Sequence, residues 1–397
     1  MVTGPMMTGP MMTGPMMTGP AASGQSQTGG HAAHPRVLVV RLDSMGDVLL
    51  TGGAIRAVAE SAAWVGMLVG RGQAATARLL PGVDEVLEFD APWVPLEPAP
   101  VEPRIVNRLV RAVRRRRFDC ALIFTSFHQS PLPTALTLRL AGVPWIGAIS
   151  EDYPGALLDL RHRVSADIPE AARNLSLAMA AGFVADADGA RLAVRRPEVS
   201  LPAWLPDRPY VVVHPGAAVP ARRPSQTRSR AFVAALVEAG WPVVVTGSRS
   251  ERELAAGVAG TAGIDAAGRL DLHGLTAVLA GARVAVVGNT GPAHLAAAVG
   301  TPVVSLFAPV VPAVRWAPYG VPMISLGDQH AACRNTRARI CPVPGHPCLD
   351  SISAEQVVAA VRTLAGADPG SPLDLTVDLA VDRADDPNLD VPTGGRP

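Results

Sequence analysis

The sequence predicts an α/β protein made of two strand–helix–strand domains. Short runs of β-branched residues, typical of buried parallel strands, alternate with segments in which apolar residues recur at helical spacing. This alternation starts near Pro35, stops in a segment with four prolines at residues 197–209, and starts again at Tyr210. At 397 residues, of which 48% are apolar, the chain is long enough for two separate cores.

Composition sets the expected domain boundaries. The two folded domains are expected at residues 35–200 and 207–365. Residues 1–20 are a fourfold pentapeptide repeat with Gly-Pro at the end of every unit, which opposes both helix and sheet. We therefore expect residues 1–34, the repeat and a polar linker, and residues 366–397, an acidic tail, to be disordered.

In the first domain, apolar runs too short and too β-branched for helices predict the strands. The strands are expected at residues 36–42, 63–69, 85–89, 119–124 and 145–148. Apolar residues at helical spacing predict the helices. The helices are expected at residues 48–59, 74–80, 104–117 and 170–181, with an extended segment at 191–194.

The same two patterns recur in the second domain. Strands are expected at residues 210–214, 241–246, 283–287 and 303–307, and helices at 229–239, 251–258, 275–281, from 292 onward and at 353–365. Gly300 is expected to end the helix that starts at Pro292, since glycine is favoured just beyond a helix. Ser353 and Gln356 form a capping-box pattern at the start of the last helix.

The segment at residues 286–302 carries the strongest local signal. A buried strand ends in Gly288-Asn289-Thr290-Gly291, a turn of small residues that lets a ligand approach the backbone closely. Thr290 is expected to cap the helix that follows. A strand, a small-residue turn and a helix N-terminus together are typical of an anion site, because free N–H groups and the helix dipole point at one place.

Asp47 follows the first strand, and two interpretations of it are open. It can simply complement the dipole of the helix that begins there. Alternatively, it faces the crevice at the carboxyl end of the sheet, where open α/β sheets bind ligands. His128 and Gln129 follow the strand at 119–124 and are candidates for binding an acceptor at the same edge of the sheet.

The charge distribution excludes some functions. The net charge is +1, so no overall field points to nucleic acid as a partner. All 35 basic residues are Arg, which removes Lys-based covalent catalysis. Seven Arg lie within residues 104–117; such a run is usually a solvated helix face, and otherwise holds an anionic acceptor or an acidic membrane surface.

Neither a membrane-spanning segment nor a secretory signal is expected from the hydropathy pattern. We therefore expect a cytoplasmic protein that visits the membrane surface at its inner face. Cys120 is expected to be a packing residue within a strand. Cys333, Cys341 and Cys348 lie in a Pro-rich loop near two His, and zinc, a disulfide or free thiols are all open for them.

Four stretches together resemble the family 9 glycosyltransferases, the heptosyltransferase-like enzymes. They are residues 41–50 (Arg-Leu-Asp-Ser-Met-Gly-Asp-Val-Leu-Leu), 214–217 (His-Pro-Gly-Ala), 244–248 (Val-Val-Thr-Gly-Ser) and 288–294 (Gly-Asn-Thr-Gly-Pro-Ala-His). The similarity spans about residues 35–365. Two departures are that Asn289 stands where many members have Asp, and that the segment at 217–223 lacks the Lys that family enzymes often carry.

The resemblance implies a GT-B fold, in which two Rossmann-like domains face a central cleft. It further implies that the first domain binds the acceptor and the second a nucleotide-diphosphate sugar such as ADP-heptose, and that transfer inverts the anomeric carbon without a metal or other cofactor. Asp47 matches the catalytic base. The donor-binding residues expected on this basis are Gly46, His214, Gly216, Arg222, Arg223, Thr246, Gly247, Asn289, Thr290, Gly291 and His294.

The leading hypothesis is therefore a glycosyltransferase of the cell envelope that acts on a glycan or a lipid-linked acceptor. An epimerase of the same architecture is the enzymatic alternative and needs acid/base groups on both sides of the sugar. A nucleotide-sugar binding protein without catalysis is the other. The Asp47→Asn substitution separates them, since it removes a base while leaving donor binding intact.

Overall fold

The computed structural model describes residues 34–164, 167–186, 188–196 and 198–366. The repeat and nearly all of the linker expected at residues 1–34, and the tail from residue 367 onward, lie outside these residues. Among the helices described, none is long and apolar enough to cross a lipid bilayer.

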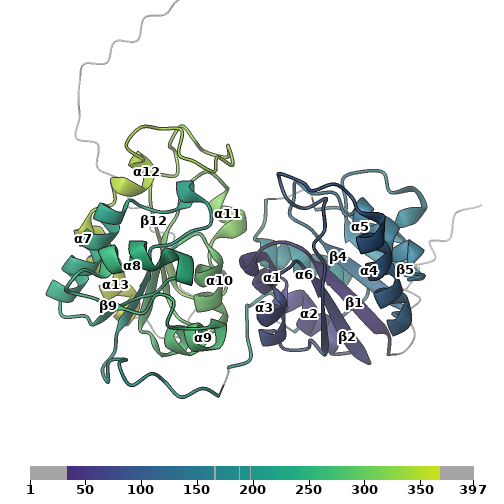
Figure 1. Ribbon diagram of the computed structural model, residues 1–397, viewed down its shortest axis with the longest axis horizontal. Helices are drawn as coiled ribbons and strands as arrows, with labels where there is room; N and C mark the ends of the chain where they lie inside the picture. Colours follow the sequence, from purple (N-terminus) through teal and green to yellow (C-terminus); the bar gives the residue numbers. More distant parts are fainter. Residues whose placement is uncertain (1–33, 165–166, 187, 197, 367–397) are drawn as a thin grey trace, which may run out of the picture. The chain divides into compact units, whose positions relative to one another are not determined.

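Within the described residues, the first sheet has six parallel strands in the order β3-β2-β1-β4-β5-β6 (Figure 1). The strands are β1 (Arg36–Arg41), β2 (Trp64–Val69), β3 (Glu85–Glu88), β4 (Cys120–Phe124), β5 (Trp145–Ile149) and β6 (Leu160–His162). The helices are α1 (Met45–Leu50), α2 (Gly52–Ala59), α3 (Ala74–Leu79), α4 (Pro103–Arg116), α5 (Leu132–Leu140) and α6 (Glu170–Ala180), with a 3-10 turn η1 (Gly155–Leu157).

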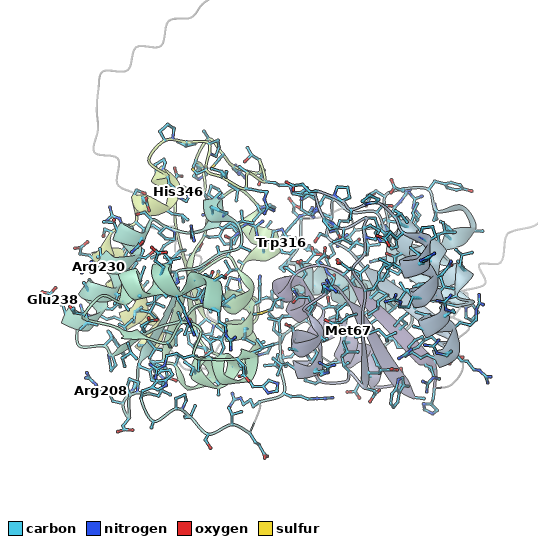
Figure 2. All side chains as sticks on the ribbon, viewed as in Figure 1. Met67, Arg208, Arg230, Glu238, Trp316 and His346 are labelled. Carbon is cyan, nitrogen blue, oxygen red and sulfur yellow. The ribbon has the colours of Figure 1, made fainter. Side chains whose placement is uncertain are left out.

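The strands are apolar throughout because helices cover both faces of the sheet. Successive residues of a strand point to opposite faces. Val37 and Val39 of β1 therefore join the core under α1, α2, α3 and α6, whereas Leu38 and Val40 join the core under α4 and α5 (Figure 1). Met67 on β2 is fully buried in the first of these cores (Figure 2).

The second sheet repeats the design, again with six parallel strands among the residues described, in the order β12-β11-β10-β7-β8-β9. The strands are β7 (Val211–His214), β8 (Val243–Val245), β9 (Ile264–Asp265), β10 (Val284–Gly288), β11 (Val303–Leu306) and β12 (Met323–Leu326). The helices are α7 (Gln226–Glu238), α8 (Arg252–Ala259), α9 (Leu272–Gly281), α10 (Gly291–Ala298), α11 (Ala313–Trp316), α12 (Pro347–Asp350) and α13 (Ala354–Gly366), with 3-10 turns η2 (Pro220–Arg222) and η3 (Arg249–Glu251).

Both sheets have the strand order of a Rossmann fold. The order reverses between β1 and β4 in the first sheet and between β7 and β10 in the second. In open α/β sheets, ligands bind outside the carboxyl ends of the strands at this switch point. We therefore expect a functional site in the segments that follow β1 and β4 and in those that follow β7 and β10.

Several elements differ from the sequence-based expectation. The single helix expected at residues 48–59 is two helices that meet at Thr51. Helix α5 and strands β6, β9 and β12 were not predicted, and the segment expected to be extended at 191–194 forms no strand. The missed strands lie at the sheet edges and are short, so their apolar runs are too brief to stand out. The capping box at Ser353 is confirmed, with reciprocal hydrogen bonds to Gln356 of 2.8 and 3.2 Å.

Candidate functional site

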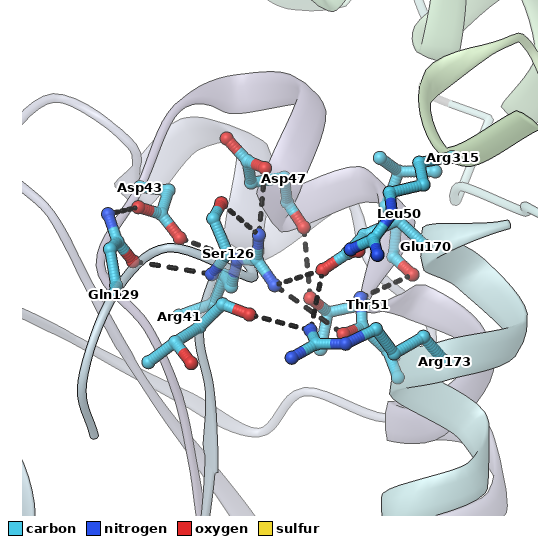
Figure 3. A network of polar contacts seen from close by, with 12 residues as sticks. Arg41, Asp43, Asp47, Leu50, Thr51, Ser126, Gln129, Glu170, Arg173 and Arg315 are labelled. Carbon is cyan, nitrogen blue, oxygen red and sulfur yellow. Dashed lines mark hydrogen bonds and ion pairs between the residues drawn. The ribbon is translucent and has the colours of Figure 1, made fainter. Parts of the chain in front are cut away.

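Arg41 is the centre of the first switch point. It is the last residue of β1 and is fully buried (Figure 3). Its guanidinium pairs with Asp43 at 2.8 Å and with Asp47 at 2.8 Å, and lies 3.4 Å from Glu170. Burial opposes the charge of Arg41, but the three carboxylates outweigh it and raise its pKa above the ordinary value. The side chain is therefore a fixed positive charge around which the acidic groups are arranged.

Asp47 lies in the first turn of α1 and is held from two sides. Its Oδ1 accepts a hydrogen bond of 2.8 Å from Arg41 Nη2, and its Oδ2 accepts bonds of 2.6 Å from the Ser44 hydroxyl and 3.2 Å from the Ser44 N–H (Figure 3). The side chain remains 13% exposed, so part of the carboxylate is open to solvent. Asp47 complements the start of α1 and also stands at the carboxyl end of the sheet, so the two interpretations of it are compatible.

Helix α6 contributes a second layer behind Arg41. Glu170 and Asn174 are both fully buried, and Glu170 also accepts a 3.0 Å bond from Arg173. Asn174 accepts a hydrogen bond from Arg41 at 3.4 Å and donates one to the Leu50 carbonyl at 3.2 Å. This layer fixes the guanidinium, because a buried arginine with so many partners cannot rotate without breaking several of them.

The segment after β4 closes the other side of the cluster. Gln129 donates a 2.6 Å bond to Asp43, and Ser126 accepts a 3.1 Å bond from Arg41 (Figure 3). Burial raises the pKa of Asp43, and Arg41 opposes this rise. His128 is exposed and packs edge-on against Phe127. Of the two acceptor candidates, Gln129 lies in the cluster and His128 lies at its surface; their role in acceptor binding stays a prediction.

The second switch point starts with His214, the last residue of β7. Its Nδ1 lies 3.0 Å from the Thr246 hydroxyl, and both side chains are buried. Its Nε2 lies 4.0 Å from Glu251, whose carboxylate also accepts two bonds from Ser248. Burial lowers the pKa of His214 although Glu251 opposes this, so the imidazole is neutral at pH 7.

Glu251 explains one of the glycines in this region. A Cβ at Gly216 would lie 2.0 Å from the Glu251 carboxylate, so a larger residue there would displace this side chain. Gly247 is less constrained, because a Cβ there would lie 3.3 Å from the Cβ atoms of Ala267 and Glu251. Gly216 therefore lets an acidic group approach the backbone at the end of β7.

The turn after β10 carries a buried carboxamide. Asn289 is 3% exposed, yet neither its Oδ1 nor its Nδ2 has a hydrogen-bond partner within the part of the chain that the structure describes. A buried amide without partners costs free energy. The predicted cap by Thr290 is wrong: this residue occupies the N-cap position of α10, but its hydroxyl lies 3.5 Å from the Gly288 carbonyl and does not cap the helix. At the start of this helix Pro292 has no N–H and the Ala293 N–H donates a 3.0 Å bond to the Thr290 carbonyl, so Gly291 is the position whose N–H can serve another partner.

Basic and imidazole groups lie around this turn. Arg222 is half-buried, and a Cβ at Gly288 would lie 2.6 Å from its carbonyl oxygen, so the two segments are in close contact. Burial acts to raise the pKa of Glu251, but hydrogen bonds from Ser248, followed by the neighbouring His214 and Arg223, outweigh it and lower that pKa. Burial lowers the pKa of His294 to about 4, so this side chain is also neutral at pH 7.

Helices α1 and α10 contact each other, and this brings Asp47 near the second group of residues. A Cβ at Gly46 would lie 2.8 Å from His294 Cδ2, and one at Gly291 would lie 3.1 Å from Met45 Cε. Burial lowers the pKa values of His294 and Arg222, and the charge of Asp47 opposes this at both. Asp47 therefore lies close enough to His294 and Arg222 for its charge to act on both side chains.

Several residues of this site were missed from the sequence, among them Arg41, Ser126, Glu170, Asn174 and Glu251. Arg41 resembles an ordinary polar end of a strand, and Glu170 lies 129 positions away in the chain. The position of Glu251 is indicated by a local pattern in the sequence, the Ser248-x-x-Glu251 capping box.

All four cysteines have free thiols, which agrees with one of the three interpretations of the loop cysteines. Cys120 is fully buried in β4, as expected of a packing residue, and burial raises its pKa to about 12. Across the described residues, no group of three or more His, Cys, Asp or Glu side chains is arranged to hold a metal ion.

Two Rossmann-type sheets with polar groups at both switch points define an α/β protein of the GT-B class. Comparison with protein families agrees, since residues 106–345 match the model described as glycosyltransferase family 9 (heptosyltransferase). The chain belongs to this glycosyltransferase family, and both the resemblance noted in the sequence and the expected GT-B fold are confirmed.

A curated relative and two solved structures are similar to the chain. Lipopolysaccharide heptosyltransferase 1 of Pseudomonas aeruginosa is 34% identical over 163 residues, which are 40% of this chain and 45% of the relative. The matched stretch therefore spans less than half of that protein. Escherichia coli ADP-heptose lps heptosyltransferase II has a TM-score of 0.65 at 18% identity, over 83% of this chain and 98% of the other. E. coli heptosyltransferase WaaC with ADP has a TM-score of 0.62 at 19% identity, over 83% and 99%.

Proposed function

We propose that the protein is an inverting, metal-independent heptosyltransferase that moves heptose from ADP-heptose to a cell-surface glycan or lipid-linked acceptor. The observation that carries the proposal is the position of Asp47, a partly exposed carboxylate held by Arg41 and Ser44 on a helix that contacts α10, which begins two residues after the buried Asn289. The names of the similar proteins, which include an ADP-heptose transferase and an ADP complex, support the choice of donor.

We further propose that residues 35–200 bind the acceptor and residues 207–365 bind the donor. The acceptor hydroxyl would lie against Asp47, within reach of Gln129. The diphosphate of the donor would lie at the N-terminus of α10, where it would give Asn289 the hydrogen bonds that no described residue supplies. His214, Thr246 and the glycines of the second switch point would surround the rest of the nucleotide.

In the proposed reaction, Asp47 takes the proton of the acceptor hydroxyl as that oxygen attacks the anomeric carbon. The bond from this carbon to the diphosphate oxygen breaks on the opposite side, and ADP leaves with the bonding electron pair. The growing negative charge on the leaving diphosphate would be stabilised by the Gly291 N–H at the start of α10 and by Arg222 and Arg223. Such fixed donors can replace a divalent cation at this step.

The roles of Arg41 and Ser44 follow from the same geometry. Both would hold the carboxylate so that its free lone pairs point toward the acceptor. The neutral His294, beside Gly46, would donate or accept a hydrogen bond without adding charge near the leaving group.

A donor panel tests the proposal. ADP-heptose, GDP-sugars and UDP-sugars are each incubated with the full chain and with candidate acceptors, and release of free nucleotide is measured. We expect acceptor-dependent release from ADP-heptose alone, with a product of inverted anomeric configuration and a rate that EDTA leaves unchanged. Turnover of UDP- or GDP-sugars in place of ADP-heptose, a retained configuration, or loss of activity with EDTA would each contradict the corresponding part of the proposal.

The enzyme is further proposed to act in the cytoplasm at the inner face of the membrane, where lipid-linked acceptors are exposed. This places it at a membrane surface without requiring it to span the bilayer.

A further inference from the structure

Helix α4 carries a stripe of arginines that the proposed active site does not use. Arg104, Arg108, Arg111 and Arg115 are spaced by four, three and four residues, so they lie on one face of the helix. All four are exposed, and the opposite face, with Leu109 and Val113, is buried against the sheet. We refer to these four residues as the arginine stripe.

Counter-charges for the arginine stripe are missing from the part of the chain that the structure describes. Its four side chains make no hydrogen bond or ion pair with any described residue, whereas the flanking Arg116 pairs with Glu85 at 2.5 Å. No acidic residue occurs between Pro103 and Arg117. Like charges three and four residues apart destabilise a helix, so the stripe is not explained by the stability of α4.

Exposed apolar side chains lie next to one end of the stripe. Leu96 is 67% exposed, Val101 is 62% exposed, and Ile105, in the first turn of α4, is 38% exposed. Because α4 follows β3 through this loop, its N-terminal end lies at the carboxyl edge of the parallel sheet. This is the edge at which Asp47 lies.

We propose that the arginine stripe, with Leu96, Val101 and Ile105, docks the protein on a bilayer of anionic phospholipids. Four exposed guanidinium groups on one helix face match the charge of such a surface, and the adjacent apolar side chains can enter its headgroup layer. The chain as a whole has a net charge of only +1, so this attraction is local to α4. The inference rests on the proposed function and extends it, since it brings the acceptor edge of the first sheet to the membrane that would hold a lipid-linked acceptor.

Vesicle partitioning of the full chain tests the docking surface. Wild type is expected to bind vesicles that contain phosphatidylglycerol, to bind phosphatidylcholine vesicles weakly, and to be released by high salt. The variant R108Q/R111Q/R115Q keeps helix-favouring side chains. Since each Arg near an anionic surface is worth roughly a factor of five in partitioning, this variant is expected to bind about 100-fold more weakly.

A control removes the same charge elsewhere. Arg78, Arg230 and Arg362 are exposed on α3, α7 and α13, and Figure 2 labels Arg230. The variant R78Q/R230Q/R362Q is expected to partition like wild type. The variant L96D/V101D tests the apolar part and is expected to weaken binding to phosphatidylglycerol vesicles.

Transfer to a water-soluble acceptor separates this inference from the proposed function. The stripe variant should turn over such an acceptor at the wild-type rate, so a failure of docking and a failure of catalysis are distinguishable. Equal vesicle binding by wild type and the stripe variant would overturn the inference, and so would equal binding by wild type to the two kinds of vesicle. Tighter binding of wild type to duplex DNA than to phosphatidylglycerol vesicles, at the same salt, would also overturn it.

Discussion

Substitution of Arg41 by Met tests whether the first switch point is held together by one buried charge. Arg41 is fully buried and contacts Asp43 and Asp47 at 2.8 Å and Glu170 at 3.4 Å. An exposed ion pair is worth at most about 1 kcal/mol, but removal of one partner from a buried pair costs about 3–5 kcal/mol, because a charge is left without compensation.

The structure favours the lower part of that range. Glu170 keeps Arg173 as a partner at 3.0 Å, whereas Asp43 and Asp47 are partly exposed and can regain water. We therefore expect R41M to lower the free energy of unfolding at pH 7 by about 3 kcal/mol. The loss should shrink as the pH falls through the carboxylate range, because protonated carboxyls no longer need a positive neighbour.

Urea unfolding from pH 7 to pH 4 measures both effects. The variant R41K keeps the charge but not the planar fork of the guanidinium, and should lie between wild type and R41M. Arg230→Met, on the exposed face of α7, is the control and should change stability by about 0.5 kcal/mol or less. A loss in R41M below about 1 kcal/mol at pH 7, or one that grows toward low pH, would refute this reasoning.

Two further predictions concern the second switch point. Asn289→Leu should leave the free energy of unfolding within about 0.5 kcal/mol of wild type, because the Asn289 carboxamide has no partner among the described residues. The same substitution should weaken ADP binding, measured by calorimetry, by about tenfold or more. A large loss of stability with unchanged ADP affinity would contradict this prediction. Burial lowers the pKa of His294 to about 4, so as the pH falls this histidine is protonated in the unfolded chain before it is protonated in the folded one. The stability that the neutral His294 contributes is therefore fully present above about pH 6.5 and is lost as the pH falls toward 4. His294→Gln should remove up to about 3 kcal/mol of that pH-dependent loss, and an unchanged pH profile of urea unfolding would show that His294 is not buried in its neutral form.

The sequence predicted the parts of the fold that depend on local pattern. Strands such as β1, β2 and β10 are buried apolar runs, and their type can be read without knowing their neighbours. Helix α5 was missed because its apolar residues do not form one stripe, since Thr134 and Thr137 are buried along with Leu138. Its position depends on packing against the sheet, which local periodicity does not record.

The candidate site divides in the same way. Asp47, His214 and Asn289 were predicted from the resemblance to family 9 glycosyltransferases, and each lies at or just after the end of a strand. Arg41 and Glu170 were not predicted, because they are 129 positions apart in the sequence and contact each other only in the folded chain. A fully buried arginine and a buried glutamate are rare unless they are paired, yet neither burial nor pairing is visible until the fold brings them together.

The Asp47→Asn substitution tests the central claim most directly. Steady-state transfer from ADP-heptose and calorimetric binding of ADP are measured on the same preparation, with Asp43→Asn as a control that removes a neighbouring carboxylate of the same cluster. We expect Asp47→Asn to lower kcat by about 100-fold or more while the Kd for ADP changes little, and Asp43→Asn to lower kcat much less. Wild-type turnover in Asp47→Asn would contradict the role of Asp47 as the base.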